Sequence, residues 1–138
     1  MATVKRFEEL TVWQKARVLN QDIIKLTQLP AFDREWKLKD QIRGSSGSVM
    51  DNIAEGFGRM GNREFVNFLL IANGSASEVR SQLTRCLDQE YISPVTHDEM
   101  LSVLDEISRM IFSLIRYLRK NEKNGKIFPI TTKIKIKT

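Results

Sequence analysis

Two stretches of this chain place an apolar residue at every third or fourth position, and this spacing restricts the possible folds more than any other feature. The first stretch, from about Glu9 to Gln28, follows the series Val12, Ala16, Leu19, Ile23 and Leu26. The second follows the series Met100, Leu104, Ile107, Ile111, Leu114 and Leu118. Residues three and four apart lie on one face of an α-helix, so each stretch predicts a helix with one apolar face.

The sequence that follows the first stretch predicts a second helix, over about residues 34–57. Pro30 ends the first helix, because the residue before a proline is pushed out of the helical region. Asp33 is the expected N-cap of the second helix. Glycine tolerates a left-handed backbone, and three glycines are expected to turn the chain after this helix: Gly56, Gly58 and Gly61.

A third helix is expected to begin at an Asn62 cap. Its small residues from Ala72 to Ser77 are expected to pack against the serine-rich part of the second helix. The fourth helix is expected to open with a capping box from Thr96 to Glu99, in which two side chains satisfy backbone amides reciprocally.

Short connections place sequential helices side by side in opposite directions. The sequence therefore predicts an all-α fold, an up-down-up-down antiparallel four-helix bundle over residues 1–120. Residues 121–138 are expected to form a basic, flexible tail, because the alternation from Lys133 to Lys137 would make one isolated strand with nothing to pair with.

The net charge of +5 is concentrated near the C-terminus. The segment from Arg119 to Thr138 contains seven basic residues and one acidic residue, Glu122. Such a segment attracts polyanions, nucleic acid among them, but it can also serve only to keep a protein in solution.

Other basic residues extend the nucleic-acid hypothesis to the helices. Two arginines flank the loop at the start of the third helix, where backbone amides favour an anion. Three basic residues share one face of the fourth helix, although a solvated face is the alternative interpretation. The hypothesis names Arg59, Arg63, Arg109, Arg116, Lys120, Lys133, Lys135 and Lys137 as contacts to RNA or DNA. Without a recognisable base-reading module, binding is expected to have little sequence preference.

The first and fourth helices have more apolar residues than the inner face of a bundle helix requires. An apolar arc of this width indicates either a wide core or a contact between subunits. The second interpretation predicts a homo-oligomer whose interface contains Leu10, Trp13, Ile24, Leu101, Phe112 and Ile115.

Catalysis, metal binding and membrane insertion find little support in the sequence. One histidine and one cysteine are too few for a zinc site, and no Glu-x-x-His pair supports a di-iron site. His97, in the expected capping box, is assigned a surface role and Cys86 a core role. No cofactor, no catalytic residue and no membrane span is expected, and the expected location is the cytoplasm.

Three sequence blocks resemble a known bacterial family. They are the stretch from Phe7 to Ala16, the triplet Gln41-Ile42-Arg43, and the block Asn52-Ile53-Ala54-Glu55-Gly56-Phe57-Gly58-Arg59. Together they resemble the four helix bundle proteins encoded within intervening sequences of 23S ribosomal RNA genes, over about residues 7–120. Met50 stands where many members have proline, so a weaker kink in the second helix is expected here.

The resemblance implies the four-helix fold and a ring-shaped homo-oligomer, typically a pentamer. It also implies kinship with Avd, the accessory protein of diversity-generating retroelements, which binds a reverse transcriptase and its template RNA. The motif residues are interpreted mainly as structural, with Glu55 expected to pair with an arginine of another helix or subunit: Arg43, Asn52, Glu55, Gly56 and Gly58. An oligomeric protein–protein scaffold without a nucleic-acid role remains the alternative function.

Overall fold

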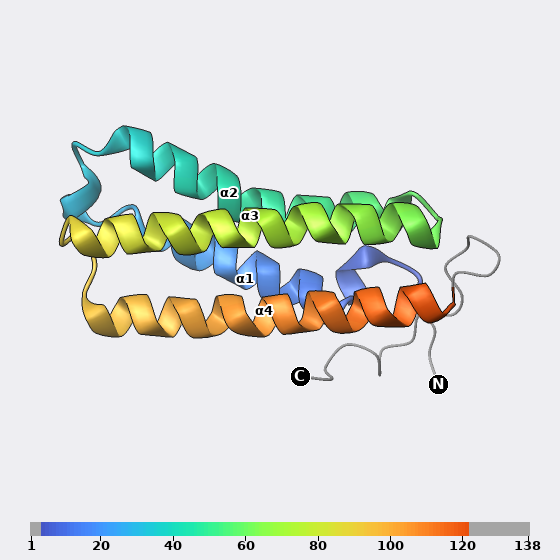
Figure 1. Cartoon of the computed structure of the whole chain (residues 1–138). Coiled ribbons are helices and arrows are strands. Elements are labelled where there is room, and N and C mark those ends of the chain that lie inside the picture. Colours follow the sequence, from blue (N-terminus) through green and yellow to red (C-terminus); the bar gives the residue numbers. More distant parts are fainter. Residues whose placement is uncertain (1–3, 122–138) are drawn as a thin grey trace.

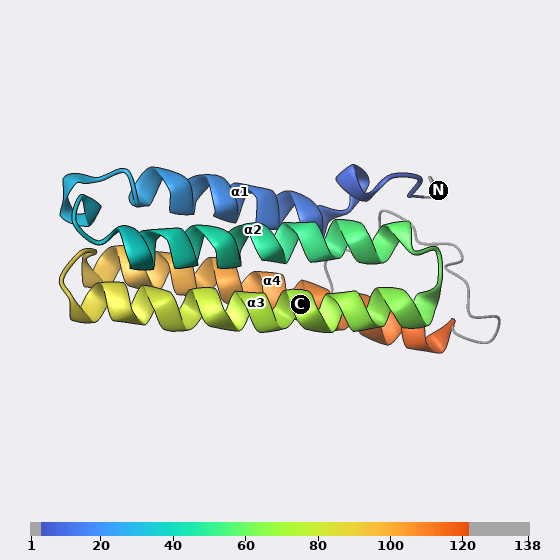
Figure 2. The same ribbon diagram turned by 90° about the horizontal axis from the view of Figure 1, so that it is seen from above.

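The computed structural model describes residues 4–121 and contains four long helices that pack side by side (Figure 1). They are α1 (Thr11–Leu26), α2 (Trp36–Gly58), α3 (Asn62–Asp88) and α4 (Pro94–Lys120), with short 3-10 turns at Phe7–Glu9 (η1) and Pro30–Phe32 (η2). Consecutive helices run in opposite directions, and α1 lies against both α2 and α4 (Figure 2). The predicted all-α four-helix bundle is confirmed.

The apolar series read from the sequence lie in the core. On α1, Val12, Ala16, Leu19 and Ile23 are buried, whereas Leu26 is half-buried. On α4 the series is buried from Leu104 to Leu118, with Met100 half-buried at its start. Burial of these side chains is the main force that holds the helices together, since it removes apolar surface from water.

The serine-rich part of α2 packs against the small residues of α3, as expected. The hydroxyls of Ser48 and Ser75 lie 2.9 Å apart across the two helices. Asn52 donates to the Ser48 backbone oxygen at 2.8 Å and to its hydroxyl at 2.9 Å, so its amide is satisfied within α2. Short side chains along this seam allow the two helix axes to approach closely.

Three of the expected helix caps were wrong. Glu35, not Asp33, precedes α2, and no side chain caps that helix. Gly61 occupies the N-cap position of α3, which leaves Asn62 as its first residue. At α4 the cap lies three residues before the expected box: the Ser93 hydroxyl accepts from the Thr96 amide at 3.1 Å, and Pro94 follows as the first helical residue.

The turn between α2 and α3 also differs from the expectation. Its left-handed residue is Met60, with φ of 66°, rather than one of the three glycines. Gly56 has a different reason to be glycine, because a Cβ placed there would lie 2.6 Å from the Phe68 Cβ and 2.9 Å from the Phe65 Cδ1. Close approach of α2 and α3 therefore requires a residue without a side chain at position 56.

Of the expected tail, only Asn121 belongs to the described residues. Within residues 4–121, none of the helices carries a stretch apolar enough to cross a lipid bilayer.

Candidate nucleic-acid interface

The start of α3 and the end of α4 are joined by one buried side chain. The Asn62 Nδ2 donates to the Leu118 backbone oxygen at 3.0 Å and to that of Asn121 at 2.8 Å. The last carbonyls of a helix lack the usual amide partner four residues further on. The Leu118 oxygen accepts from the Asn121 backbone amide at 3.2 Å, and Asn62 adds a second donor to it and supplies one to the Asn121 oxygen. This bond fixes the register between α3 and α4 at this end of the bundle.

Several of the predicted basic residues meet at the same end. Arg59 and Arg63 flank the α2–α3 turn, and Arg116 and Lys120 lie in the last two turns of α4 (Figure 1). All four are exposed. Arg119, which the sequence hypothesis did not name, is exposed beside them, so residues 113–121 carry three cations and no carboxylate. We call Arg59, Arg63, Arg116, Arg119 and Lys120 the basic end.

Arg59 is already engaged by neighbouring side chains. Its Nε lies 3.2 Å from the Glu55 Oε2, and its guanidinium lies 5.1 Å from the centre of the Phe68 ring. Glu55 thus pairs within α2 and not with another helix, contrary to the expectation. Because both partners are about half exposed, the pair is weak and a phosphate can compete for the arginine.

Arg109 lies further back along the exposed face of α4 that leads to the basic end. Arg116 on the same face donates from its Nη2 to the Ser113 hydroxyl at 3.1 Å. Asp105, one turn before Arg109 on α4, is bonded to the Arg80 Nη1 at 2.6 Å. The predicted contacts Lys133, Lys135 and Lys137 lie outside the described residues.

The family-motif residues lie along α2 and make contacts within the bundle. Arg43 donates from its Nε to the Thr27 hydroxyl at 2.8 Å, which ties the end of α1 to α2. Asn52 belongs to the Ser48–Ser75 seam, and Gly56 is the point of closest approach to α3. Gly58, at the end of α2, has open space around it.

The six residues predicted to form a subunit interface do not share one exposed surface. Leu10 and Ile115 are buried in the core of the single chain, because α4 turns its wide apolar arc toward both α1 and α3. Three others are half-buried: Trp13, Ile24 and Leu101. Only Phe112 is exposed, and it lies on the α3 side of α4, away from the α1 residues.

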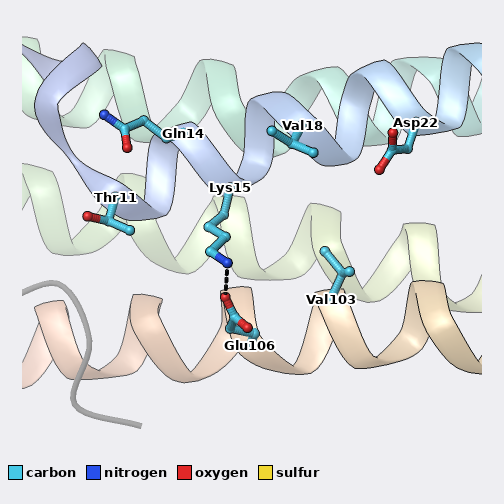
Figure 3. Close-up of a pocket in the computed structure, with 7 residues that line it drawn as sticks. All are labelled: Thr11, Gln14, Lys15, Val18, Asp22, Val103 and Glu106. Carbon is cyan, nitrogen blue, oxygen red and sulfur yellow. Dashed lines mark ion pairs between the residues drawn. The ribbon is translucent and has the colours of Figure 1, made fainter.

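A groove of about 320 Å³ runs between α1 and α4, on the side of α4 opposite to Phe112 (Figure 3). Its residues are Thr11, Gln14, Lys15, Val18, Asp22, Val103 and Glu106. The Lys15 Nζ lies 2.5 Å from the Glu106 Oε1 and bridges the two helices. Val18 is half exposed in this groove, so an apolar surface does exist along α1 and α4, at residues other than those predicted.

The side chains that most often carry chemistry are occupied or shielded. Cys86 is buried, and burial raises the pKa of its thiol from 9.0 to about 11, so it is protonated at neutral pH. His97 is buried, not on the surface as expected, with its Nε2 3.2 Å from the Thr84 hydroxyl. Among residues 4–121, no group of histidine, cysteine and carboxylate side chains could hold a metal ion.

Fold and charge together define a small all-α bundle of four antiparallel helices with basic side chains gathered at one end. A family model gives the more particular assignment, because the 23S rRNA-intervening sequence protein family matches residues 8–113. The chain belongs to this family. The family motifs in the sequence had indicated the same assignment.

A solved structure of similar fold is a protein of unknown function from Bacteroides thetaiotaomicron, assigned to the S23 ribosomal protein family. The TM-score is 0.71 at 24% sequence identity, over 77% of this chain and 99% of the other. At this identity the likeness concerns the fold. No curated protein matches the chain.

Sequence reasoning missed two features of this site. Arg119 follows Arg116 by three residues, a helical spacing that would have placed both on the exposed face. The Asn62 bond to α4 had no sequence signal, because an asparagine before a helix is normally its cap.

Proposed function

We propose that this protein is a non-enzymatic, cytoplasmic, ring-forming protein that binds nucleic acid, RNA or DNA, through its basic end. The observation that carries this proposal is the meeting of Arg59 and Arg63 with the end of α4, which Asn62 holds in place. The lysines after Asn121 are covalently attached at this same end and extend the proposed contact surface.

Electrostatics support the proposal. A cluster of cations with few paired carboxylates lowers the free energy of a bound phosphate chain mainly by releasing the counterions around it. The basic face continues from Arg116 back to Arg109, over about 10 Å of helix at 1.5 Å per residue. We therefore propose contacts to backbone phosphates, which supply affinity without sequence preference.

A ring of subunits, with five as the proposed number, follows from the resemblance to the four helix bundle proteins. The groove between α1 and α4 is the surface we assign to the subunit contact, since Val18 is exposed there. A Val18→Asp variant is expected to lower the solution mass measured by light scattering. Val95→Asp, at an exposed site on the first turn of α4, is the matched control and should leave the mass unchanged.

An accessory role beside a reverse transcriptase rests on the resemblance to Avd alone. We include it because such a partner would bring a template RNA to the basic end. Co-elution of the purified enzyme with this protein, in the absence of RNA, is the measurement that would support it.

The nucleic-acid proposal is tested by measuring RNA affinity as a function of salt. Changing both Arg109 and Arg116 to glutamate should weaken binding at least about tenfold and make the salt dependence shallower by roughly one unit per lost phosphate contact. Removing residues 121–138 should weaken RNA binding further. The number of subunits in the oligomer, measured as its mass in solution, should not change.

The matched control also changes two basic residues to glutamate, the exposed Lys25 and Arg34 at the other end of the bundle. This pair should leave RNA binding almost unchanged. Full RNA binding by the Arg109 and Arg116 variant without residues 121–138 would refute the proposal.

The alternative scaffold function has one specific observation in its favour. Leu29, Trp36 and Val95 are exposed apolar residues in or next to the two connections at the opposite end, with Trp36 at 69% exposure. An exposed tryptophan is a frequent anchor in protein interfaces. A protein indifferent to RNA at every salt concentration would leave this function as the better explanation.

A further inference from the structure

The exposed surface formed by α3 and α4 combines cations with apolar side chains. The Ser108 hydroxyl donates to the Asn73 Oδ1 at 2.9 Å, and Asn62 bonds to Leu118, so two contacts define the antiparallel register. One turn from the first contact, this register places Leu70 opposite Phe112. At the second contact, Arg63 directly follows Asn62 and Arg119 directly follows Leu118, so both arginines lie at this end of the surface.

Phe112 and Leu70 are 39% and 41% exposed, respectively. Large apolar side chains at this exposure on a helix surface gain stability only if something covers them. Arg109 and Arg116 lie one turn before and one turn after Phe112 on the same helix, at the spacing that puts all three on one face. The partly exposed ring therefore shares a helix face with two arginines, of which Arg116 donates to the Ser113 hydroxyl.

We propose that this α3–α4 surface binds single-stranded nucleic acid, with an unpaired base stacked on Phe112 and the flanking phosphates held by Arg109, Arg116 and Arg119. This inference rests on the proposed function and narrows it from nucleic acid in general to unpaired strands. It also gives Phe112 a role different from a subunit contact.

The chemistry of the surface favours an unpaired strand over the other occupants. Every base has a π-face, so an aromatic ring beside cations binds single strands with little sequence preference. Bases inside a duplex are already stacked and cannot reach the ring. A protein partner with an acidic face would satisfy the arginines and could bury Phe112, but burial is a contact that leucine can also supply, whereas stacking of a base needs the flat ring.

The test uses the full chain and a fluorescently labelled, unstructured oligouridylate, compared with an RNA duplex of equal length. Phe112→Ala should weaken binding of the single strand roughly tenfold, the effect of losing one stacked base. It should leave duplex binding and the salt dependence unchanged, because no charge is lost. Phe112→Tyr should restore the affinity, whereas Phe112→Leu should not.

Trp36→Ala is the matched control, because it removes an exposed aromatic residue at the opposite end of the bundle. This variant should bind the single strand as the unmodified protein does. Circular dichroism establishes that each variant is folded.

Four results would overturn the inference. They are equal affinity of Phe112→Ala and the unmodified protein for the single strand, equal losses for single strand and duplex, rescue by Phe112→Leu, and a lower solution mass of Phe112→Ala. In each case salt-dependent RNA binding by the unmodified protein would leave the proposed function standing. If the unmodified protein binds neither RNA, the proposed function fails first and the stacking inference with it.

Discussion

The two ends of the bundle differ in charge and in the way they are closed. At the basic end, residues 113–121 contain three cations and no carboxylate, and Asn62 bonds across from α3 to α4. At the opposite end, residues 88–99 contain four carboxylates and no lysine or arginine. That end is closed by a local cap at Ser93 and by the rings of Phe32 and Tyr91, whose centres lie 5.2 Å apart.

The opposite end is thus stabilised by a local contact, and the basic end by a contact between residues far apart in the sequence. The Ser93 cap depends on residues three apart in the sequence, whereas the Asn62 bond joins residues 56 and 59 positions apart. A long-range bond positions one helix relative to another, which a local cap cannot do. The basic end therefore has a defined geometry between two helices, as a binding surface made from both requires.

The largest expected difference between the ends is in the free energy of unfolding, when Asn62 at one end and Ser93 at the other are replaced. Asn62→Leu removes both side-chain hydrogen bonds between α3 and the end of α4, and the expected loss in the free energy of unfolding is about 3 kcal/mol, at up to about 1.5 kcal/mol for each bond. Ser93→Ala removes one N-cap and should cost about 1 kcal/mol. Urea denaturation measures both values, and a greater loss for Ser93→Ala would contradict the comparison.

Two glycines of α2 provide a comparison within one helix. Gly56→Ala forces a Cβ against Phe68 near the basic end, and the expected loss is about 2 kcal/mol from overpacking. Gly44→Ala, in the other half of α2, meets open space and should stabilise the protein by up to about 1 kcal/mol through helix propensity. Thermal unfolding of the two variants should shift in opposite directions, and equal shifts would show that packing does not select glycine at position 56.

The pH dependence of stability gives a smaller effect at each end. Burial raises the pKa of the Cys86 thiol to about 11, so the unfolded chain loses this proton first as pH rises through 9. The thiol's contribution to stability is complete below pH 9, is reduced by roughly 1 kcal/mol at pH 10, and is lost progressively up to pH 11.

Tyr117, near the basic end, also has a pKa raised by burial, so its contribution declines in the same direction at alkaline pH. Cys86→Ala separates the two residues, because it should flatten the decline in unfolding free energy between pH 8 and pH 10 and leave the tyrosine contribution above that range. An unchanged slope in this variant would show that the thiol is not the group responsible.

Much of the fold was predictable because apolar periodicity depends on the core, which lies along the whole length of each helix. The series on α1 and α4 and the small residues around Ser75 all found their expected places. Helix ends were less predictable, since several residues at each end can serve as a cap. Ser93, followed by Pro94, has a stronger start signal than Thr96, and Asn62 is used across helices instead of along its own.

The candidate site was predictable in part for the same reason. An antiparallel order alone brings the α2–α3 turn next to the end of α4, so Arg59 and Arg63 had to lie near Arg116 and Lys120. Burial of individual apolar residues was not predictable from a helical wheel. Leu10 and Ile115 were assigned to a surface, whereas α1 and α4 bury them, because a wheel shows direction but not the neighbours on either side.

Asn62 has a further consequence for whatever follows Asn121 in the chain. By holding the Asn121 carbonyl, it fixes the point from which the remaining lysines are attached, next to the arginines of the basic end. A strand held by those arginines would meet the lysines as an intramolecular partner, at an effective concentration in the millimolar range that is typical of short linkers. Under the proposed function, one buried amide would thereby link the arginines and the lysines into a single bivalent binder.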